Sequence, residues 1–256
     1  MNGPEGVVDA ARAVWSEVDL DAIRANVAAL REVAAPAALL AVVKANGYGH
    51  GAVPVARAAL DAGASWLGIA RVEEGEQLRA AGIDAPIMLL SEPAPRVAAR
   101  VVEAQLVPVV YTEAGVDALA KAVADAGQGA PLDVHLKVDT GMHRVGCAPD
   151  DALALARAIA ARDELTLAGV CTHLAVADEP DNPSTTEQLA RFDAVLAELD
   201  AVGVARGHGG DAARGAHLRT EAVRDACARG QRLHERDARA QRQRGTQRQV
   251  IVAHRR

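Results

Sequence analysis

Six short apolar runs, each followed by a segment in which apolar residues recur at helical spacing, occupy most of the first 204 residues of this chain. Runs of this length and branching are typical of buried strands. Strands that alternate with helices are joined as parallel neighbours through helical crossovers, so the pattern predicts an α/β fold with a parallel sheet. The predicted strands begin near residues 39, 66, 86, 106, 132 and 165. The fourth contains Pro108, which weakens the prediction there because proline cannot donate to a sheet.

Two architectures share this alternation, a doubly wound sheet and a (β/α)8 TIM-type barrel. No GxGxxG motif follows the first strand, which argues against a dinucleotide-binding version of the doubly wound sheet. Polar residues with catalytic potential follow several successive strands, and a barrel gathers such residues at the carboxyl ends of its strands. We therefore expect an incomplete (β/α)8 barrel, because about six of the eight units are recognisable before residue 204.

The segment ahead of the first run has two patterns. Residues 15–19 alternate between apolar and polar side chains, as a half-buried strand does. Apolar residues then recur at helical spacing from Leu20, and Pro36 is expected to end that helix. Residues 1–14 are expected to form an N-terminal extension.

A single lysine, Lys44, stands at the end of the first apolar run, and a loop with three glycines and Tyr48 follows it. The chain has only three lysines against 25 arginines. An amine at the end of a buried strand must be neutral, paired or covalently used, unless it extends past the strand end to water. The lysine alone leaves these alternatives evenly balanced. The glycines favour a site, because such a loop can bring backbone N–H groups close to a phosphate.

A second cluster, residues 137–146, follows the fifth predicted strand and reads Lys-Val-Asp-Thr-Gly-Met-His-Arg-Val-Gly. By itself this cluster is typical of a turn, in which Asp139 and Thr140 bond locally and Gly141 takes a positive φ. His173 follows the sixth predicted strand, and a lone histidine in such a place is usually structural. The residues alone therefore favour a turn in the first case and a structural histidine in the second.

Four segments together resemble a known family. The run Val-Val-Lys-Ala-Asn-Gly-Tyr-Gly-His-Gly at residues 42–51 resembles the cofactor-lysine motif of alanine racemases, which are fold-type III pyridoxal 5′-phosphate (PLP) enzymes. Gly47 stands where the family usually has alanine. Residues 137–146 resemble the second signature of the family, and residues 15–20 and 172–175 resemble two further segments. The resemblance extends from residue 15 to about residue 200.

The resemblance implies a role for each of five residues. Lys44 would carry PLP covalently and act as one of two catalytic bases, and Tyr48 would bond the cofactor phosphate. Arg144 would bind the cofactor ring oxygen and the substrate carboxylate, a task that suits a planar, permanently charged fork. Lys137 matches a position that is often carbamylated in the family, which would make it an anionic partner for the arginine. His173 would pack against the cofactor ring.

Composition argues against several other classes of protein. No apolar run is long enough to span a membrane, and the N-terminus lacks the pattern of a secretion signal. Three cysteines without paired spacing fit a reduced, cytoplasmic compartment. The histidines show no metal-ligand spacing, so no metal is expected.

Composition changes after residue 204. Residues 205–256 hold 13 arginines, five acidic residues and no lysine, whereas the whole chain has a formal net charge of −6. This segment does not resemble the family, and it shows no sustained apolar periodicity, so we expect a disordered tail. Nucleic acid is not favoured as its partner, because a shifted reading frame in GC-rich DNA also produces such a composition. The predicted domains are therefore 1–14, the PLP-binding barrel at 15–204, and the tail at 205–256.

The function implied by the resemblance is the interconversion of L-alanine and D-alanine, an isomerase activity that supplies D-alanine for the bacterial cell wall. The family works as a homodimer, in which a tyrosine from the partner's C-terminal β-domain is the second base. That domain is not recognisable here, and without the second base the chain is expected to be inactive. An open barrel of six strands is also expected to leave two unpaired sheet edges, which lower its solubility. The alternatives are another fold-type III amino-acid racemase and a non-catalytic PLP-binding remnant.

Overall fold

The computed structural model describes residues 17–127, 129–179, 181–203 and 251–254. Their strands form one sheet in the order β6-β5-β4-β3-β2-β1-β7, in which β1 to β6 are parallel and β7 is antiparallel to β1. The strands are β1 (Ala38–Val42), β2 (Trp66–Ile69), β3 (Ile87–Leu89), β4 (Val107–Val110), β5 (Leu132–Lys137), β6 (Leu165–Cys171) and β7 (Ile251–His254). The helices are α1 (Leu20–Ala34), α2 (Lys44–Tyr48), α3 (Ala52–Asp61), α4 (Val72–Ala80), α5 (Ala98–Glu103), α6 (Glu113–Ala126), α7 (Ala152–Ala160) and α8 (Ser184–Ala201), with short 3₁₀ turns at Pro95–Val97 and Pro149–Asp151.

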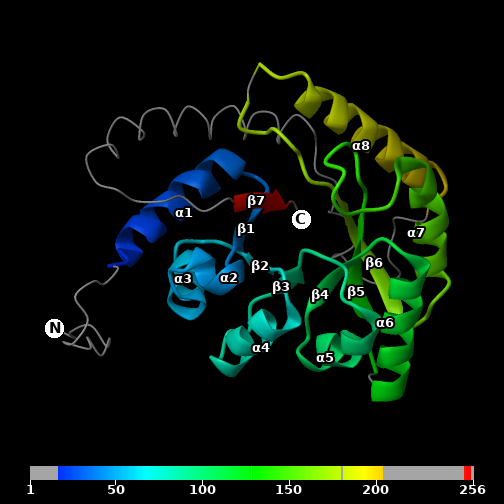
Figure 1. The fold of residues 1–256 in the computed structure, drawn as a ribbon, viewed down its shortest axis with the longest axis horizontal. Coiled ribbons are helices and arrows are strands. Elements are labelled where there is room, and N and C mark those ends of the chain that lie inside the picture. The colour runs from blue at the N-terminus through cyan, green and yellow to red at the C-terminus, as the bar shows by residue number, and fades with distance from the viewer. Residues whose placement is uncertain (1–16, 128, 180, 204–250, 255–256) are drawn as a thin grey trace.

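The sheet curves as a barrel wall does. Helices α3 to α7 follow one another along the outer side of the strands (Figure 1). On the inner side, the rings of Trp66 on β2 and His135 on β5 meet edge to face, with centroids 6.1 Å apart. Three inter-strand spacings of a flat sheet would separate these strands by about 14 Å. The contact therefore requires strong curvature, and it supports the predicted partial (β/α)8 barrel over a doubly wound sheet.

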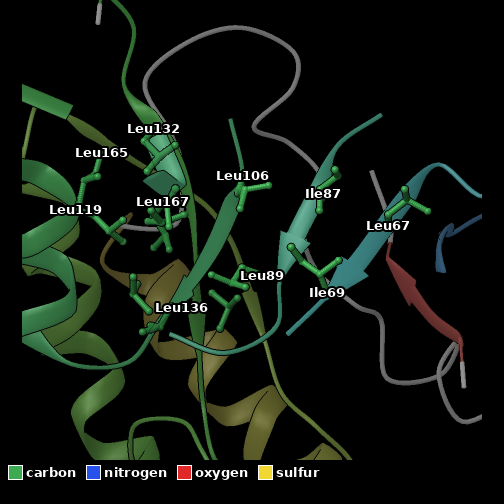
Figure 2. Packing of buried hydrophobic residues seen from close by; sticks show 14 of the residues in the cluster. Leu67, Ile69, Ile87, Leu89, Leu106, Leu119, Leu132, Leu136, Leu165 and Leu167 are labelled. Carbon is green, nitrogen blue, oxygen red and sulfur yellow. The ribbon is translucent and has the colours of Figure 1, made fainter. Parts of the chain in front are cut away.

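Alternate residues of β1 enter two separate apolar layers, as the two-residue period of a strand requires. On β1, Leu39 and Ala41 belong to the large core between the strands and the helices, whereas Leu40 and Val42 belong to a small core inside the curve. Figure 2 shows leucine and isoleucine side chains that belong to the large core, from β2 round to β6. The continuous apolar character of β1 follows from this burial on both faces, whereas β5 alternates apolar residues with Asp133, His135 and Lys137.

The predicted parallel strands and their following helices are confirmed within the described residues. Pro108 does lie in β4, where it is the register partner of Leu89 on β3. The strand predicted at residues 15–19 was wrong for residues 17–19, while residues 15 and 16 lie outside the described residues. Asp19 instead caps α1, because its carboxylate accepts hydrogen bonds from the backbone N–H groups of Asp21 and Ala22.

Two unpaired sheet edges were expected, but the edge at β1 is paired. Residues 251–254, from the segment expected to be disordered, form β7 and pair with β1 in the register Ala38 to His254. β6 stands at the opposite end of the sheet. The predictions for residues 1–14 and for 205–250 lie outside the described residues, and the domain boundary at residue 204 stays a prediction.

Candidate functional site

The peptide after β1 turns in the left-handed sense at Lys44. The φ angles of Ala45, Asn46 and Gly47 are 51°, 54° and 62°, so the predicted glycine loop is a left-handed helical turn. The N–H of Gly47 donates to the carbonyl of Val43 over 2.8 Å, which closes the turn directly over the strand end. Left-handed backbone costs about 1–2 kcal/mol at each residue with a side chain. A turn of this kind persists only where its surroundings hold it.

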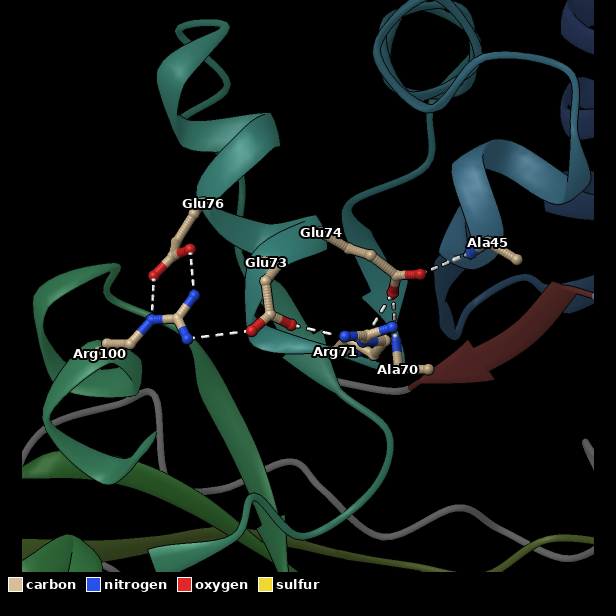
Figure 3. Close-up of polar contacts among 7 residues, drawn as sticks. All are labelled: Ala45, Ala70, Arg71, Glu73, Glu74, Glu76 and Arg100. Carbon is tan, nitrogen blue, oxygen red and sulfur yellow. Dashed lines mark hydrogen bonds and ion pairs between the residues drawn. The ribbon is translucent and has the colours of Figure 1, made fainter. Parts of the chain in front are cut away.

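Two side chains hold the turn, one from another element and one from within the turn. Glu74 of α4 accepts a hydrogen bond from the N–H of Ala45 over 2.7 Å with one carboxylate oxygen (Figure 3). Its other oxygen accepts from the N–H groups of Ala70 and Arg71, at the start of α4. Asn46 lies in the turn itself and accepts from the N–H of Ala52, the first residue of α3. The turn is therefore fixed to the ends of two helices.

Lys44 lies over the ring of Tyr48, with its Nζ 5.8 Å from the ring centroid. Tyr48 also has a positive φ, of 54°, and its side chain is 41% exposed. The left-handed turn thus brings the predicted cofactor lysine and the predicted phosphate-binding tyrosine to the same side of the strand end. Lys44 is partly exposed and Tyr48 is exposed.

Lys137 ends β5 and is 6% exposed. It alternates with Leu136, whose side chain enters the large core, so Lys137 faces the inside of the curve. Its Nζ donates to the carbonyl of Leu90 over 3.5 Å, a long hydrogen bond to the loop after β3. A buried amine that has only this hydrogen bond among the described residues is costly to bury, and a negative ligand group nearby would offset that cost.

The turn predicted after β5 is present, but only one of its two polar residues bonds locally. Asp139 accepts hydrogen bonds from the N–H groups of Gly141, Met142 and His143 with one carboxylate oxygen. Partial burial raises the pKa of Asp139, but these bonds and the charge of His143 hold it below its ordinary value. Thr140 does not bond within the turn and instead reaches the loop after β6.

Three of the predicted residues carry charges that act on the imidazole of a fourth, His173. Burial lowers the pKa of His173 below its ordinary value. The positive charges of Lys137, Arg144 and Lys44, in that order, lower it further. Lys44 follows β1, whereas Lys137 ends β5 and Arg144 is in the loop after it, so charges from two strand ends act on one imidazole. Three cations at the strand ends attract phosphate and carboxylate groups.

Sequence reasoning missed two side chains that shape this site. Glu74 gave no signal because it resembles any acidic residue in the first turn of a helix. Gln188 gave a signal that was not used. It precedes Phe192, Val195 and Leu199 at helical spacing and so falls on the apolar face of α8, where a polar residue is unusual.

The described residues contain no group of three or more His, Cys, Asp and Glu side chains that could hold a metal ion. In the same part of the chain, every helix is too short or too polar to cross a membrane.

Comparison with known proteins gives a consistent result. The family model described as "Alanine racemase, N-terminal domain" matches residues 18–220, which extends past the predicted boundary at residue 204. An alanine racemase of Symbiobacterium thermophilum is 50% identical over 197 residues, which cover 77% of this chain and 52% of that protein. An alanine racemase of Thermobifida fusca is 48% identical, with 74% of this chain and 51% of that protein covered.

Solved structures agree with the sequence relatives. Alanine racemase from D-cycloserine-producing Streptomyces lavendulae superposes with a TM-score of 0.67 at 44% identity, and the match covers 73% of this chain and 49% of that one. Alanine racemase from Bacillus anthracis with bound L-Ala-P superposes with a TM-score of 0.68 at 36% identity, over 74% of this chain and 49% of that one. The chain therefore spans about half the length of the relatives it matches.

Proposed function

Because this chain belongs to the alanine racemase family, we propose that it binds PLP through Lys44 and contributes one half of the site that interconverts L-alanine and D-alanine. Enzymes of this family use PLP. The observation that carries the proposal is that Lys44, Lys137, Arg144 and His173 all stand at or just after the carboxyl ends of parallel strands in one curved sheet.

The residues present fit PLP, which has an aldehyde and a phosphate. Lys44 offers a primary amine at the rim of the site, where its Nζ lies over the ring of Tyr48. Arg144 and Lys137 contribute two further cations, which favour a phosphate and a substrate carboxylate at these strand ends. The lowered pKa of His173 keeps its imidazole neutral at pH 7, so this ring can pack on an aromatic ring without adding a fourth charge.

PLP, when bound, supplies the electron sink that makes loss of a proton from the α-carbon of an amino acid feasible. The protein must then bind the amino acid, orient its Cα–H bond and move the proton. We assign the carboxylate of the substrate to Arg144, whose guanidinium can form two parallel hydrogen bonds with it. We assign proton transfer on one face of the α-carbon to the amine of Lys44. Tyr48 would donate its hydroxyl hydrogen to the phosphate.

Inversion of the α-carbon needs a second base on the opposite face, which Lys44 cannot reach from its own side. We propose that this base comes from outside residues 17–203 and that a homodimer brings it to the site, as the family resemblance implies. By this proposal, residues 17–203 provide cofactor binding and one of the two proton transfers. The choice among small amino acids as substrates then depends on groups beyond this half of the site.

Covalent labelling tests the cofactor proposal directly. The full chain would be incubated with PLP and then with borohydride, and the labelled peptide would be mapped by mass spectrometry. We expect the label on Lys44 and its loss in Lys44→Ala. Lys121→Ala is the matched control, because Lys121 is an exposed lysine on α6 that pairs with Asp125. Label on Lys121 with none on Lys44 would refute the proposal.

A chiral assay for D-alanine formed from L-alanine then tests the reaction. Conversion that depends on Lys44 supports a racemase. Label on Lys44 without any D-alanine would reduce the function of this chain to cofactor binding, which is the non-catalytic alternative.

A further inference from the structure

Gln188 of α8 has a buried amide that contacts both strand-end loops of the site. Its side chain is 1% exposed. The amide nitrogen donates to the carbonyl of His173 over 3.0 Å and to the hydroxyl of Thr140 over 3.3 Å. The amide oxygen accepts from the N–H of Ala175 over 2.9 Å. Both donors of the amide are thus used, together with one acceptor position.

The contacts of Gln188 are part of a larger connection between the two loops. The hydroxyl of Thr140, after β5, lies 2.8 Å from the hydroxyl of Thr172, after β6. Thr140 is fully buried, and its carbonyl accepts a hydrogen bond from Arg191, one helical turn after Gln188, over 2.7 Å. The loop that carries Arg144 and the loop that carries His173 are therefore joined to each other and to α8.

Packing alone does not explain a glutamine at this position. The neighbouring buried residues of α8 are Leu189, Phe192 and Val195, and an apolar side chain of similar size would extend that surface. A buried amide instead requires a hydrogen bond for each polar atom, and each one left unmade costs about 1–3 kcal/mol. The three hydrogen-bond partners of Gln188 all lie in the loops after β5 and β6. The amide therefore holds these two loops in place relative to each other.

We propose that Gln188 is a positioning residue, whose amide fixes the loop of Arg144 against the loop of His173 so that both side chains face one ligand. The identity of that ligand rests on the proposed function. The connection between the loops does not, because it is made by hydrogen bonds within the protein. Loss of the amide would let the two loops move apart without removing any residue that touches the ligand.

The pKa of the His173 imidazole depends on how the two loops are placed, so it can be used to measure their placement in the absence of any ligand. Its pKa is lowered by burial and by the charges of Lys137, Arg144 and Lys44. If the loops separate, the imidazole loses part of both effects, so its pKa rises toward the ordinary value of about 6.5. A loss of stability elsewhere would leave this pKa unchanged as long as the protein stays folded.

Two substitutions distinguish the N–H donors of the Gln188 amide from its oxygen acceptor. Gln188→Met keeps the length of the side chain and removes all three hydrogen bonds. Gln188→Glu keeps an oxygen for the N–H of Ala175 and loses both donors. Gln77→Met is the control for the exchange itself, because Gln77 is exposed on α4. Leu196→Ala is the control for lost packing on α8. Leu196 is buried on the same helix, and its apolar side chain forms no hydrogen bonds.

The experiment follows the imidazole signals of the cofactor-free full chain by NMR titration, with His173→Gln to assign the signal. We expect both Gln188 variants to raise the pKa of His173 and to weaken PLP binding by about tenfold or more, while Gln77→Met and Leu196→Ala leave both unchanged. An unchanged His173 pKa in Gln188→Met, or an equal rise in Leu196→Ala, would overturn the proposal. If the unsubstituted chain binds no PLP, the proposed function fails, and the titration still decides the role of Gln188.

Discussion

Replacing Glu74 by alanine is the sharpest test of how the left-handed turn at Lys44 is held. Glu74 accepts three backbone hydrogen bonds, from Ala45 at 2.7 Å, Ala70 at 2.8 Å and Arg71 at 3.1 Å. Because the acceptor is a carboxylate, each bond contributes about 1.5–3 kcal/mol before the released N–H groups hydrate. Ala45 is exposed, so its N–H recovers part of that loss from water. We therefore expect Glu74→Ala to lower the free energy of unfolding by about 3–5 kcal/mol.

This loss is large compared with the total stability of about 5–15 kcal/mol that is typical of a folded domain. For a domain of this size it corresponds to a fall in Tm of roughly 10 °C. The effect should also be local. Once Ala45 loses its partner, the strain of about 1–2 kcal/mol at each left-handed residue with a side chain is no longer opposed. The peptide that contains Lys44 and Tyr48 should then exchange its amide hydrogens faster than the rest of the chain.

Thermal unfolding followed by circular dichroism measures the first effect, and hydrogen exchange with mass spectrometry measures the second. Glu73→Ala is the matched control, because Glu73 lies next to Glu74 in the first turn of α4 and forms exposed ion pairs with Arg71 and Arg100 (Figure 3). Exposed ion pairs contribute little to stability. If the two variants unfold at the same temperature, or if exchange at residues 44–48 does not change, the reasoning about Glu74 is refuted.

Two further perturbations test the packing of the wall and the turn after β5. Gly75→Ala should lower the free energy of unfolding, measured in urea, by about 1–2 kcal/mol. The new Cβ would lie 2.6 Å from the side chain of Leu106, and the cost of this overpacking exceeds the gain in helix propensity. A variant as stable as the original would contradict this. Asp139→Asn tests the lowered pKa of Asp139. A carboxylate with a lowered folded pKa stabilises the protein above its unfolded pKa of about 3.9, and this contribution disappears as the pH falls through the folded pKa. The difference in urea midpoint between the two proteins should therefore be largest near neutral pH and shrink toward about pH 3, and a difference that is constant with pH would count against the assignment.

The local sequence pattern was sufficient to predict the order of the six parallel strands and the helices that follow them. Each predicted strand is rich in apolar residues and is followed by a helical pattern, so the six βα units can be recognised without knowledge of their neighbours. The ends of parallel strands gather at one edge, but the residues after β5 and β6 were by themselves typical of a turn and a structural histidine, so the common site of Lys44, Lys137, Arg144 and His173 was predicted from the family resemblance. Their roles rested on a family resemblance and remain proposals.

Three features depended on contacts that no local pattern contains. The left-handed turn at Lys44 is fixed by Glu74, which is 29 residues away in sequence. Thr140 was expected to bond within its own turn. Its hydroxyl instead forms hydrogen bonds with Thr172, just after β6, and with Gln188 on α8. The pairing of β7 with β1 joins residues more than 200 positions apart.

The sequence by itself determined the order of the six parallel strands and their helices, and which side chains stand at the ends of those strands. Those properties follow from periodicity, since a side chain's face depends only on its position along its own element. The tertiary structure alone decided the hand of the Lys44 turn and the spacing of the loops around His173. Each of these is set by a hydrogen bond to a residue on another element, and its energy exists only after the barrel wall has formed.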